Sequence, residues 1–246
     1  MHGCGNDFIV IDEHDGRVEI DPTRARALCD RRTGVGADGV LVIGRPKGAR
    51  WPLVIHNADG SIADACGNGS RCVVRYLLER YGGEALELDT KSGVVRGWRD
   101  VEGYAIELDA PQLGSALAIA VGGREYEART VRVGNPNVVV FVDDPATVDL
   151  EALAAASTAL AGPANVAAVR VQSGGEISLR VHERGAGETL ACGTGSCAAV
   201  AAATARGDVT SDTVRVRLPG GTLVVRARGA RYELAGPAEY VFQGDA

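Results

Sequence analysis

Two nearly identical hexapeptides, about half a chain apart, constrain the fold more than any other feature of this sequence. Residues Ala65–Ser70 read ACGNGS and residues Ala191–Ser196 read ACGTGS. In both places a predicted strand precedes the motif, a predicted helix follows it, and a meander of strands comes after the helix. Chance recurrence in a chain with 33 glycines is the alternative. The matching order of elements favours an internal duplication.

The first half is expected to hold two helices among short strands. Pro22 suits a first helical turn behind Asp21 as its N-cap, and Gly82 suits the end of a second helix. Runs of β-branched residues between turn residues predict the strands. We expect helices at residues 22–32 and 70–83, and strands at residues 8–12, 39–44, 52–57, 85–90, 93–99 and 104–109.

The second half is expected to repeat this order. Helices are predicted at residues 149–160 and 196–207, and strands at 130–133, 137–144, 176–183, 214–229 (a hairpin) and 231–242. The predicted fold class is α/β (α+β) with two pseudo-symmetric halves. Residues 1–110 carry the first cysteine motif, residues 111–236 carry the second, and residues 237–246 are expected to pack back onto the first half. The start, MHGCGNDF, is abrupt, so a few residues of a first strand are expected upstream.

The composition is that of an ordinary soluble globular protein and argues against several partners. Hydrophobic residues make up 46% of the chain, charged residues make up 24%, and the net charge is −6. This charge argues against nucleic acid or an anionic membrane as a partner. No apolar run reaches the roughly 18 residues of a membrane helix. Without a signal-peptide pattern, the protein is expected in the cytoplasm.

The six cysteines are expected to be free thiols, because a chain of this size without a secretion signal belongs in a reducing compartment. Their spacings near the motifs are C-x5-C and C-x4-C, which differ from the usual zinc pattern, so no metal is expected. Four cysteines are expected only to pack in the core: Cys4, Cys29, Cys72 and Cys197.

A cysteine at a glycine-rich helix start is suited to two tasks. The backbone N–H groups and the helix dipole there bind a carboxylate, and they favour the thiolate form of cysteine. Two such motifs facing one substrate would place a thiol on each side of an α-carbon. One thiolate could then remove the α-proton while the other thiol supplies one, which inverts the carbon without a cofactor. The alternative is that Cys66 and Cys192 are merely small buried residues.

Six blocks of the sequence carry a resemblance to a known family. They are HGCGNDF (His2–Phe8), GVGADG (Gly34–Gly39), NADGSIADACGNGSRC (Asn57–Cys72), GNPN (Gly134–Asn137), ANV (Ala164–Val166) and HERGAGETLACGTGSCAA (His182–Ala199). In these blocks the chain resembles the diaminopimelate epimerases. The resemblance implies two similar halves, each a β-structure wrapped around a central helix, with the active site in the cleft between them. It also implies cofactor-independent interconversion of LL- and meso-2,6-diaminopimelate for lysine and peptidoglycan synthesis, and a homodimer.

The resemblance also assigns roles to individual residues. Cys66 and Cys192 match the two catalytic cysteines, and Glu183 matches an acidic residue that lies near the thiols and contacts the substrate amine. The α-carboxylate is expected on the backbone of Gly67, Asn68, Gly193 and Thr194. The distal end of the substrate is expected on Asn57, Asn135, Asn165 and Arg184, with Asn6 as a further contact. Taken singly, these residues have ordinary alternatives: a turn-forming asparagine, a surface ion pair or an exposed strand-end carboxylate.

Two positions depart from the family pattern. The family usually has histidine where this chain has Asn137, and an amide cannot share a proton with a thiol. His56 and His182 are poor substitutes, because each precedes a predicted site residue on a strand and so faces the opposite side. We therefore expect a shifted pH optimum or slower turnover. At Gly39 many relatives have a glutamine near the substrate.

Three rival functions remain open at this stage. A racemase of another amino acid would keep the chemistry and change the substrate, although the retained distal set favours a second carboxylate. A non-catalytic anion-binding or thiol-redox protein would use the same paired helix starts. A related isomerase without cysteine chemistry is disfavoured, because both thiols are present.

Overall fold

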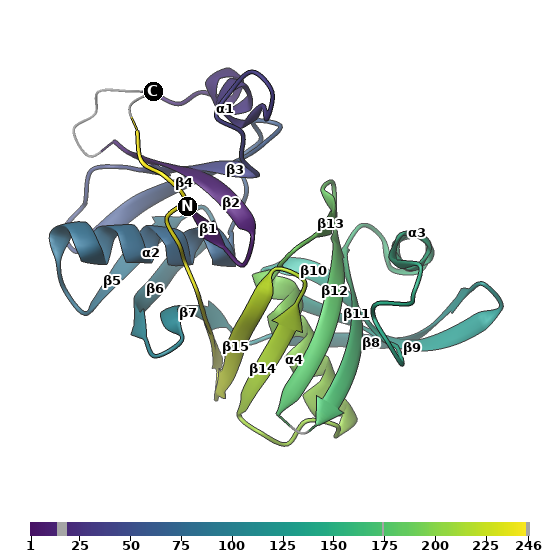
Figure 1. Cartoon of the computed structure of the whole chain (residues 1–246). Coiled ribbons are helices and arrows are strands. Elements are labelled where there is room, and N and C mark those ends of the chain that lie inside the picture. The colour runs from purple at the N-terminus through teal and green to yellow at the C-terminus, as the bar shows by residue number, and fades with distance from the viewer. Residues whose placement is uncertain (14–18, 174, 245–246) are drawn as a thin grey trace. The chain divides into compact units, whose positions relative to one another are not determined.

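The computed structural model describes residues 1–13, 19–173 and 175–244. Contacts divide the chain into two compact units. Unit 1 comprises Met1–Glu107 and Ala235–Ala246, and unit 2 comprises Leu108–Leu234 (Figure 1). Among the described helices, none is long and apolar enough to cross a membrane.

Unit 1 arranges its strands around one long helix, α2 (Gly67–Tyr81), which contacts β1, β2, β3, β5 and β6. The strands are hydrogen-bonded in the order β1 to β7. Their bounds are β1 His2–Gly3, β2 Asn6–Asp12, β3 Gly39–Ile43, β4 Arg50–Asn57, β5 Ala85–Thr90, β6 Gly93–Asp100 and β7 Gly103–Asp109. A short helix, α1 (Pro22–Cys29), packs against β3 and β4.

The core of unit 1 forms where α2 meets the sheet. Val73, Val74, Leu77 and Leu78 are at most 2% exposed, and burying each such side chain stabilises the fold by about 2 kcal/mol. Gly97 on β6 makes the close approach possible, since a Cβ there would lie 2.2 Å from Val74 Cγ2. The position of α2, and with it the place of the first cysteine motif, therefore depends on this contact.

Unit 2 surrounds a second helix, α4 (Gly193–Arg206), which contacts strands β9 to β12 and β15. The strand order is β16-β15-β14-β12-β11-β10-β9-β8, and β13 pairs with β12 off this path. Their bounds are β8 Gln112–Val121, β9 Arg124–Val133, β10 Asn135–Phe141, β11 Asn165–Ser173, β12 Glu176–Glu183, β13 Gly187–Thr189, β14 Thr213–Leu218, β15 Gly221–Arg228 and β16 Arg231–Gly236. A further helix, α3 (Leu150–Ala161), packs against β8 and strands β11 to β13.

Small side chains on α4 allow the strands of unit 2 to pack closely against this helix. Every residue from Gly193 to Ala203 is buried, and alanine has the highest helix propensity of all residues. A second apolar cluster lies beneath α3, where Leu150 and Leu153 pack with Val138, Val140 and Val166. The strands of this cluster, β10 and β11, supply predicted site residues at their first positions.

The structure confirms the predicted fold class and corrects several boundaries. Both motif helices begin three residues earlier than expected, because the glycines taken for a turn form the first helical turn. Helix α1 ends at Cys29, since the Asp30 side chain accepts hydrogen bonds from the backbone of Arg32 and Thr33 and starts a turn there. Four strands were not predicted: β1, β8, β11 and β13.

The buried thiols of unit 1 give a testable pH dependence of stability. Burial raises the pKa of Cys72 to about 12 and also raises the pKa values of Cys4 and Cys29. The folded state therefore keeps protons that the unfolded chain releases above a pH of about 8.5. We expect the free energy of unfolding to fall as the pH rises from 8.5 to 10, by up to ~1.4 kcal/mol per pH unit for each thiol.

Urea unfolding under reducing conditions at pH 8, 9 and 10 measures this slope. Cys72→Ala removes one of the thiols and should flatten the slope, while a packing defect alone would lower stability equally at every pH. A wild-type protein whose stability stays constant over this range would contradict the prediction.

Candidate functional site

Cys66 is the N-cap of α2. Its backbone is extended, and its Sγ accepts a hydrogen bond from the backbone N–H of Gly69 at 3.4 Å. The Cys66 carbonyl accepts from the N–H of Ser70 at 2.9 Å, which closes the first helical turn. At helix positions N1 and N2 the N–H groups of Gly67 and Asn68 have no acceptor within the helix. Helix starts of this kind bind anions, and the thiol is held at this one.

Cys192 caps α4 in the same way. Its Sγ accepts from the N–H of Gly195 at 3.4 Å, and its carbonyl accepts from the N–H of Ser196 at 3.0 Å. Gly193 and Thr194 occupy positions N1 and N2, so the two motifs of the duplicated sequence give the same local geometry.

Amide side chains surround Cys66. Asn6, at the start of β2, has its Oδ1 4.0 Å from the Cys66 Sγ and accepts a hydrogen bond from Asn68 Nδ2 at 3.1 Å. The other end of the Asn6 amide donates to Asp38 at 2.8 Å. Asp38 belongs to an ion-pair cluster in which Arg31 bridges it to Asp7. The structure thus brings Asn6, Asn68 and Cys66 together.

The environment of Cys192 is more deeply buried and includes a carboxylate. Its Sγ lies 3.4 Å from the Thr194 hydroxyl and 4.0 Å from Asn165 Nδ2. Asn165 in turn accepts from the backbone N–H of Arg184 at 3.0 Å. Glu183, whose Oε1 accepts from the Thr189 hydroxyl at 2.6 Å, is a hydrogen-bond partner of the thiol. Asn165, Glu183 and Thr194 are therefore assembled around Cys192.

Burial and then the Glu183 carboxylate raise the pKa of the Cys192 thiol well above its ordinary value. Hydrogen bonds from Thr194 and Gly195 lower it, but they do not compensate. The helix start favours a thiolate in general, but at Cys192 this effect is the smaller one. Inside the protein, loss of water around the sulfur outweighs the helix dipole. Cys192 is suited to be the proton donor at rest.

The predicted residues of β10 lie next to this group. Asn135 and Asn137 face the same side of the strand, and the Asn137 Nδ2 donates to the Asn135 carbonyl at 2.9 Å. Asn137 pairs in parallel register with Asn165, which contacts Cys192. The Oδ1 of Asn137 is buried and has no hydrogen-bond partner among the described residues. It is a buried acceptor on the strand that pairs with Asn165.

The two remaining predicted contacts have solvent-exposed side chains. Asn57 donates to the Ser61 hydroxyl at 2.9 Å within a turn, and it lies in one sheet row with Gly39 and Phe8. The Arg184 side chain is exposed at the end of β12. No contact in the described residues joins Asn57 to Cys66, so its part in a site remains a prediction.

Gly39 departs from the family pattern for a steric reason. A Cβ at this position would lie 2.5 Å from the backbone carbonyl of His56. A glutamine here would require the paired strands β3 and β4 to separate. His56 itself is 3% exposed and lies inside the fold, whereas Asn57 is exposed, which agrees with the opposite facing predicted for these neighbours.

The sequence analysis missed three residues that shape the site. Asp38 fixes the amide of Asn6, and Thr189 fixes the carboxylate of Glu183. Arg71, which follows the first motif directly, donates to Asn68 at 2.9 Å. Asp38 and Arg71 both lie within blocks that carried the resemblance, so their position in the sequence was the available signal.

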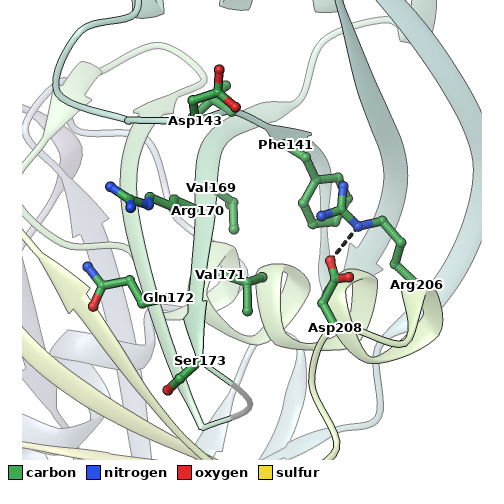
Figure 2. A pocket seen from close by; sticks show the side chains of 10 residues that line it. Phe141, Asp143, Val169, Arg170, Val171, Gln172, Ser173, Arg206 and Asp208 are labelled. Atoms are coloured by element: carbon green, nitrogen blue, oxygen red, sulfur yellow. Dashed lines mark hydrogen bonds and ion pairs between the residues drawn. The ribbon is translucent and has the colours of Figure 1, made fainter.

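A pocket of about 530 Å³ lies in unit 2, away from these residues (Figure 2). It is lined by β11 side chains such as Arg170 and Gln172 and by Arg206 at the C-terminal end of α4. Arg206 pairs with Asp208 and stacks 3.7 Å from the centre of the Phe141 ring. Cys192 caps the other end of α4, about 21 Å away along the helix. The pocket and the cysteine site are distinct features.

None of the six cysteines, all of which lie in the described ranges, forms a disulfide bond. Within the ranges that the structure describes, no group of three or more His, Cys, Asp or Glu side chains is placed to hold a metal ion. The groups that the two helix starts present are thiols, amides, one carboxylate and backbone N–H donors. They can bind a carboxylate and move a proton.

Known proteins with similar sequences share one description. The family model for diaminopimelate epimerase matches residues 1–113 and 129–241. The diaminopimelate epimerase of Thioalkalivibrio sulfidiphilus is 38% identical over 99% of this chain and 96% of its own length. That of Xanthomonas euvesicatoria pv. vesicatoria is 40% identical over 100% of this chain and 94% of its own length.

Solved structures with the same fold are more distant in sequence. A phenazine biosynthesis protein of the PhzF family from Enterococcus faecalis matches with a TM-score of 0.73 at 17% identity, over 97% of this chain and 91% of that one. A hydroxyproline epimerase from Agrobacterium vitis matches with a TM-score of 0.66 at 18% identity, over 86% and 76% of the two chains. These likenesses support the fold class, and the full-length sequence matches confirm the resemblance. The chain belongs to the diaminopimelate epimerase family.

Proposed function

We propose that this protein interconverts LL- and meso-2,6-diaminopimelate by moving one proton at the α-carbon between two cysteines. One observation carries the proposal: each half of the duplicated sequence places a cysteine as the N-cap of a buried helix, with amide side chains beside it. Membership of this family makes the chain an enzyme of the isomerase class with a small-molecule substrate.

The two thiols differ in their proposed roles. Cys192 is held as a thiol by burial and by Glu183, so it supplies a proton to one face of the α-carbon. Cys66 is less buried and accepts an N–H hydrogen bond, so as a thiolate it removes the proton from the other face. When the reaction runs in the opposite direction, the two cysteines exchange these roles.

The starts of α2 and α4 are proposed to stabilise the negative charge that develops when the α-proton is removed. We propose that the α-carboxylate accepts hydrogen bonds from the N–H groups of Gly67 and Asn68 and of Gly193 and Thr194. Removing the α-proton moves negative charge into this carboxylate, and donors that are already oriented stabilise that charge without reorganising. In this scheme no cofactor takes part.

The distal end of the substrate defines the specificity. We propose that Asn57, Asn135, Asn165 and Arg184 hold the distal carboxylate and amine, with Asn6 as a further contact and Glu183 on the reacting amine. A guanidinium and several amides suit a zwitterionic group, because they combine a charge with donors and acceptors in fixed geometry. A racemase of a monocarboxylic amino acid would not need this set.

The lack of a titratable group at position 137 is expected to alter the pH dependence of the reaction. Relatives have an imidazole there, whereas the Asn137 amide cannot accept a proton from a thiol. Asn137→His should therefore introduce a new ionisation near pH 6.5 into the profile of kcat/KM, with a change in rate of up to about tenfold. Rates measured from pH 5.5 to 10 test this, and a profile identical to that of the wild type would contradict the role.

Solvent isotope exchange tests the proposed function most directly. Freshly reduced enzyme is incubated with meso-diaminopimelate in heavy water, and α-deuterium is followed by NMR while chiral chromatography separates the isomers. We expect deuterium uptake together with LL product. The same assay with monocarboxylic amino acids is the control. Exchange of those compounds alone would point to the racemase, and an activity that follows the disulfide state with no isotope exchange at all would point to a redox protein.

Two further proposals are location in the cytoplasm, which follows from the sequence pattern, and assembly as a homodimer, which follows from the resemblance. Sedimentation at micromolar concentration and cell fractionation would test them.

A further inference from the structure

Arg71 is the largest fully buried side chain that carries a charge in the described part of the chain, with 0% exposure. It lies on α2, directly after the cysteine motif. Its guanidinium donates to the Asn68 Oδ1 at 2.9 Å and to the Gly67 carbonyl at 3.4 Å. Gly3 on β1 packs over it, since a Cβ there would lie 3.1 Å from the guanidinium.

The direction of this side chain places its charge at the start of the helix. Side chains on a helix lean toward its N-terminus, and the bond to the carbonyl four residues earlier shows that Arg71 does so. Its positive charge therefore adds to the positive end of the helix dipole, next to Cys66. Burying a guanidinium is costly, and an apolar side chain of similar size often stabilises a fold as well. Since stability does not require a buried charge here, we look for a functional role of Arg71.

A short chain of amides links Arg71 to the thiol. Arg71 fixes the Oδ1 end of Asn68, which turns the Nδ2 end of that amide toward Asn6 at 3.1 Å. The same Asn6 oxygen lies 4.0 Å from the Cys66 sulfur. Because this oxygen already accepts from Asn68, its contact with a thiol proton is weak. These hydrogen bonds thus orient the amides beside Cys66 and do not supply a proton to its thiolate.

The guanidinium already acts on other thiols of unit 1. It lowers the pKa values of Cys72 and Cys4, although burial raises both more strongly. Cys66 lies within the motif that Arg71 follows, and it is less buried than either thiol. Other ionisable groups at this end of α2 include the Met1 amine, the thiols of Cys4 and Cys72, the Asp7–Arg31–Asp38 cluster, the Asp64–Lys91 pair and the His2–Glu239 pair, whose carboxylate raises the pKa of Cys4. The carboxylates of the Asp7–Arg31–Asp38 cluster and of the Asp64–Lys91 pair are each paired with a cation.

Unit 2 offers the opposite arrangement at the matching position. Cys197 follows the second motif at the position where Arg71 follows the first, and its side chain is fully buried. The charged neighbour of Cys192 is the carboxylate of Glu183. The duplicated motifs therefore differ in the sign of the charge beside each cysteine.

We propose that Arg71 is a positioning residue that stabilises the thiolate of Cys66 through the first turn of α2. The resting enzyme then holds its base at Cys66 and its acid at Cys192. This inference rests on the proposed function for its meaning, but it is a statement about Cys66 that can be tested without any substrate.

The test is the pH dependence of Cys66 alkylation. The reduced full-length protein is treated with iodoacetamide from pH 5 to 10, and modification of Cys66 is measured by peptide mass spectrometry. We expect a midpoint below the value of about 8.5 for free cysteine, and a rise of about one pH unit or more in Arg71→Met and Arg71→Gln. Arg71→Lys keeps the charge and should restore most of the shift. Arg71→Gln keeps a donor for Asn68, so it separates charge from hydrogen bonding.

Arg75→Met is the matched control. Arg75 lies one turn farther along α2, where it pairs with Glu79, so its loss should leave the Cys66 midpoint unchanged. A wild-type midpoint at or above 8.5, or an unchanged midpoint in a folded neutral variant, overturns the inference. If neither neutral variant folds, the wild-type midpoint decides. Because no substrate is used, a negative alkylation result would not contradict the proposed function. A negative exchange result would likewise not contradict the role of Arg71 at Cys66.

Discussion

Replacing either Cys66 or Cys192 by alanine is expected to lower kcat/KM for epimerisation by at least about 10³-fold. Each variant keeps one helix start and one thiol but loses the group that serves the other face of the α-carbon. General acid or base catalysis by one positioned group contributes about 10²–10⁴-fold, and inversion needs both groups in one turnover. The double variant should be hardly slower than either single one, since the two thiols act as a unit.

The chain supplies matched controls on the same helices. Cys72→Ala on α2 and Cys197→Ala on α4 also remove a thiol, but both residues are fully buried core positions. They should lower stability by about 1 kcal/mol or somewhat more, while kcat/KM stays within about threefold of the wild type. Initial rates from each isomer, measured in fresh reductant, make the comparison. A Cys66→Ala or Cys192→Ala enzyme with near-normal turnover would contradict the two-thiol mechanism.

Local sequence signals were sufficient for much of the fold. Asp21 and Pro22 start α1 as predicted, and strands β5 and β12 have the predicted bounds, because capping residues and β-branched runs act over a few residues. Strand β11 was missed because NVAAVRVQS is buried at its start and lacks the alternation of a half-buried strand. Strand β8 was missed because glycine, serine and alanines interrupt the apolar residues of QLGSALAIAV, so it lacks the β-branched run of a typical strand.

The site was predicted less evenly, for a physical reason. The motifs located both cysteines, since the N-cap geometry is local to each hexapeptide. The charge around each cysteine is not local. Asp38 reaches Asn6 only because β2 and β3 pair, and Glu183 meets Cys192 only because β12 packs against α4. The net raising of the Cys192 pKa therefore could not be predicted from its own motif.

Replacing Glu183 by glutamine is expected to move the basic limb of the kcat/KM profile to lower pH. Burial first, and then the Glu183 carboxylate, raises the pKa of Cys192. A neutral amide removes the second cause, so Cys192 loses its proton at a lower pH and ceases to be an acid there. At neutral pH the loss of the proposed contact with the substrate amine should also lower kcat/KM by about 10²-fold.

Glu188→Gln is the control for this change, because Glu188 lies on β13 of the same hairpin and pairs with Arg180 at 2.7 Å. It should leave the profile unchanged. Alkylation of Cys192 measures the same shift without turnover, and its midpoint should fall in Glu183→Gln while that of Cys66 stays constant. A basic limb that stays in place, or moves to higher pH, would show that Glu183 does not hold Cys192 as a thiol. Burial alone would then have to account for the proton that Cys192 supplies.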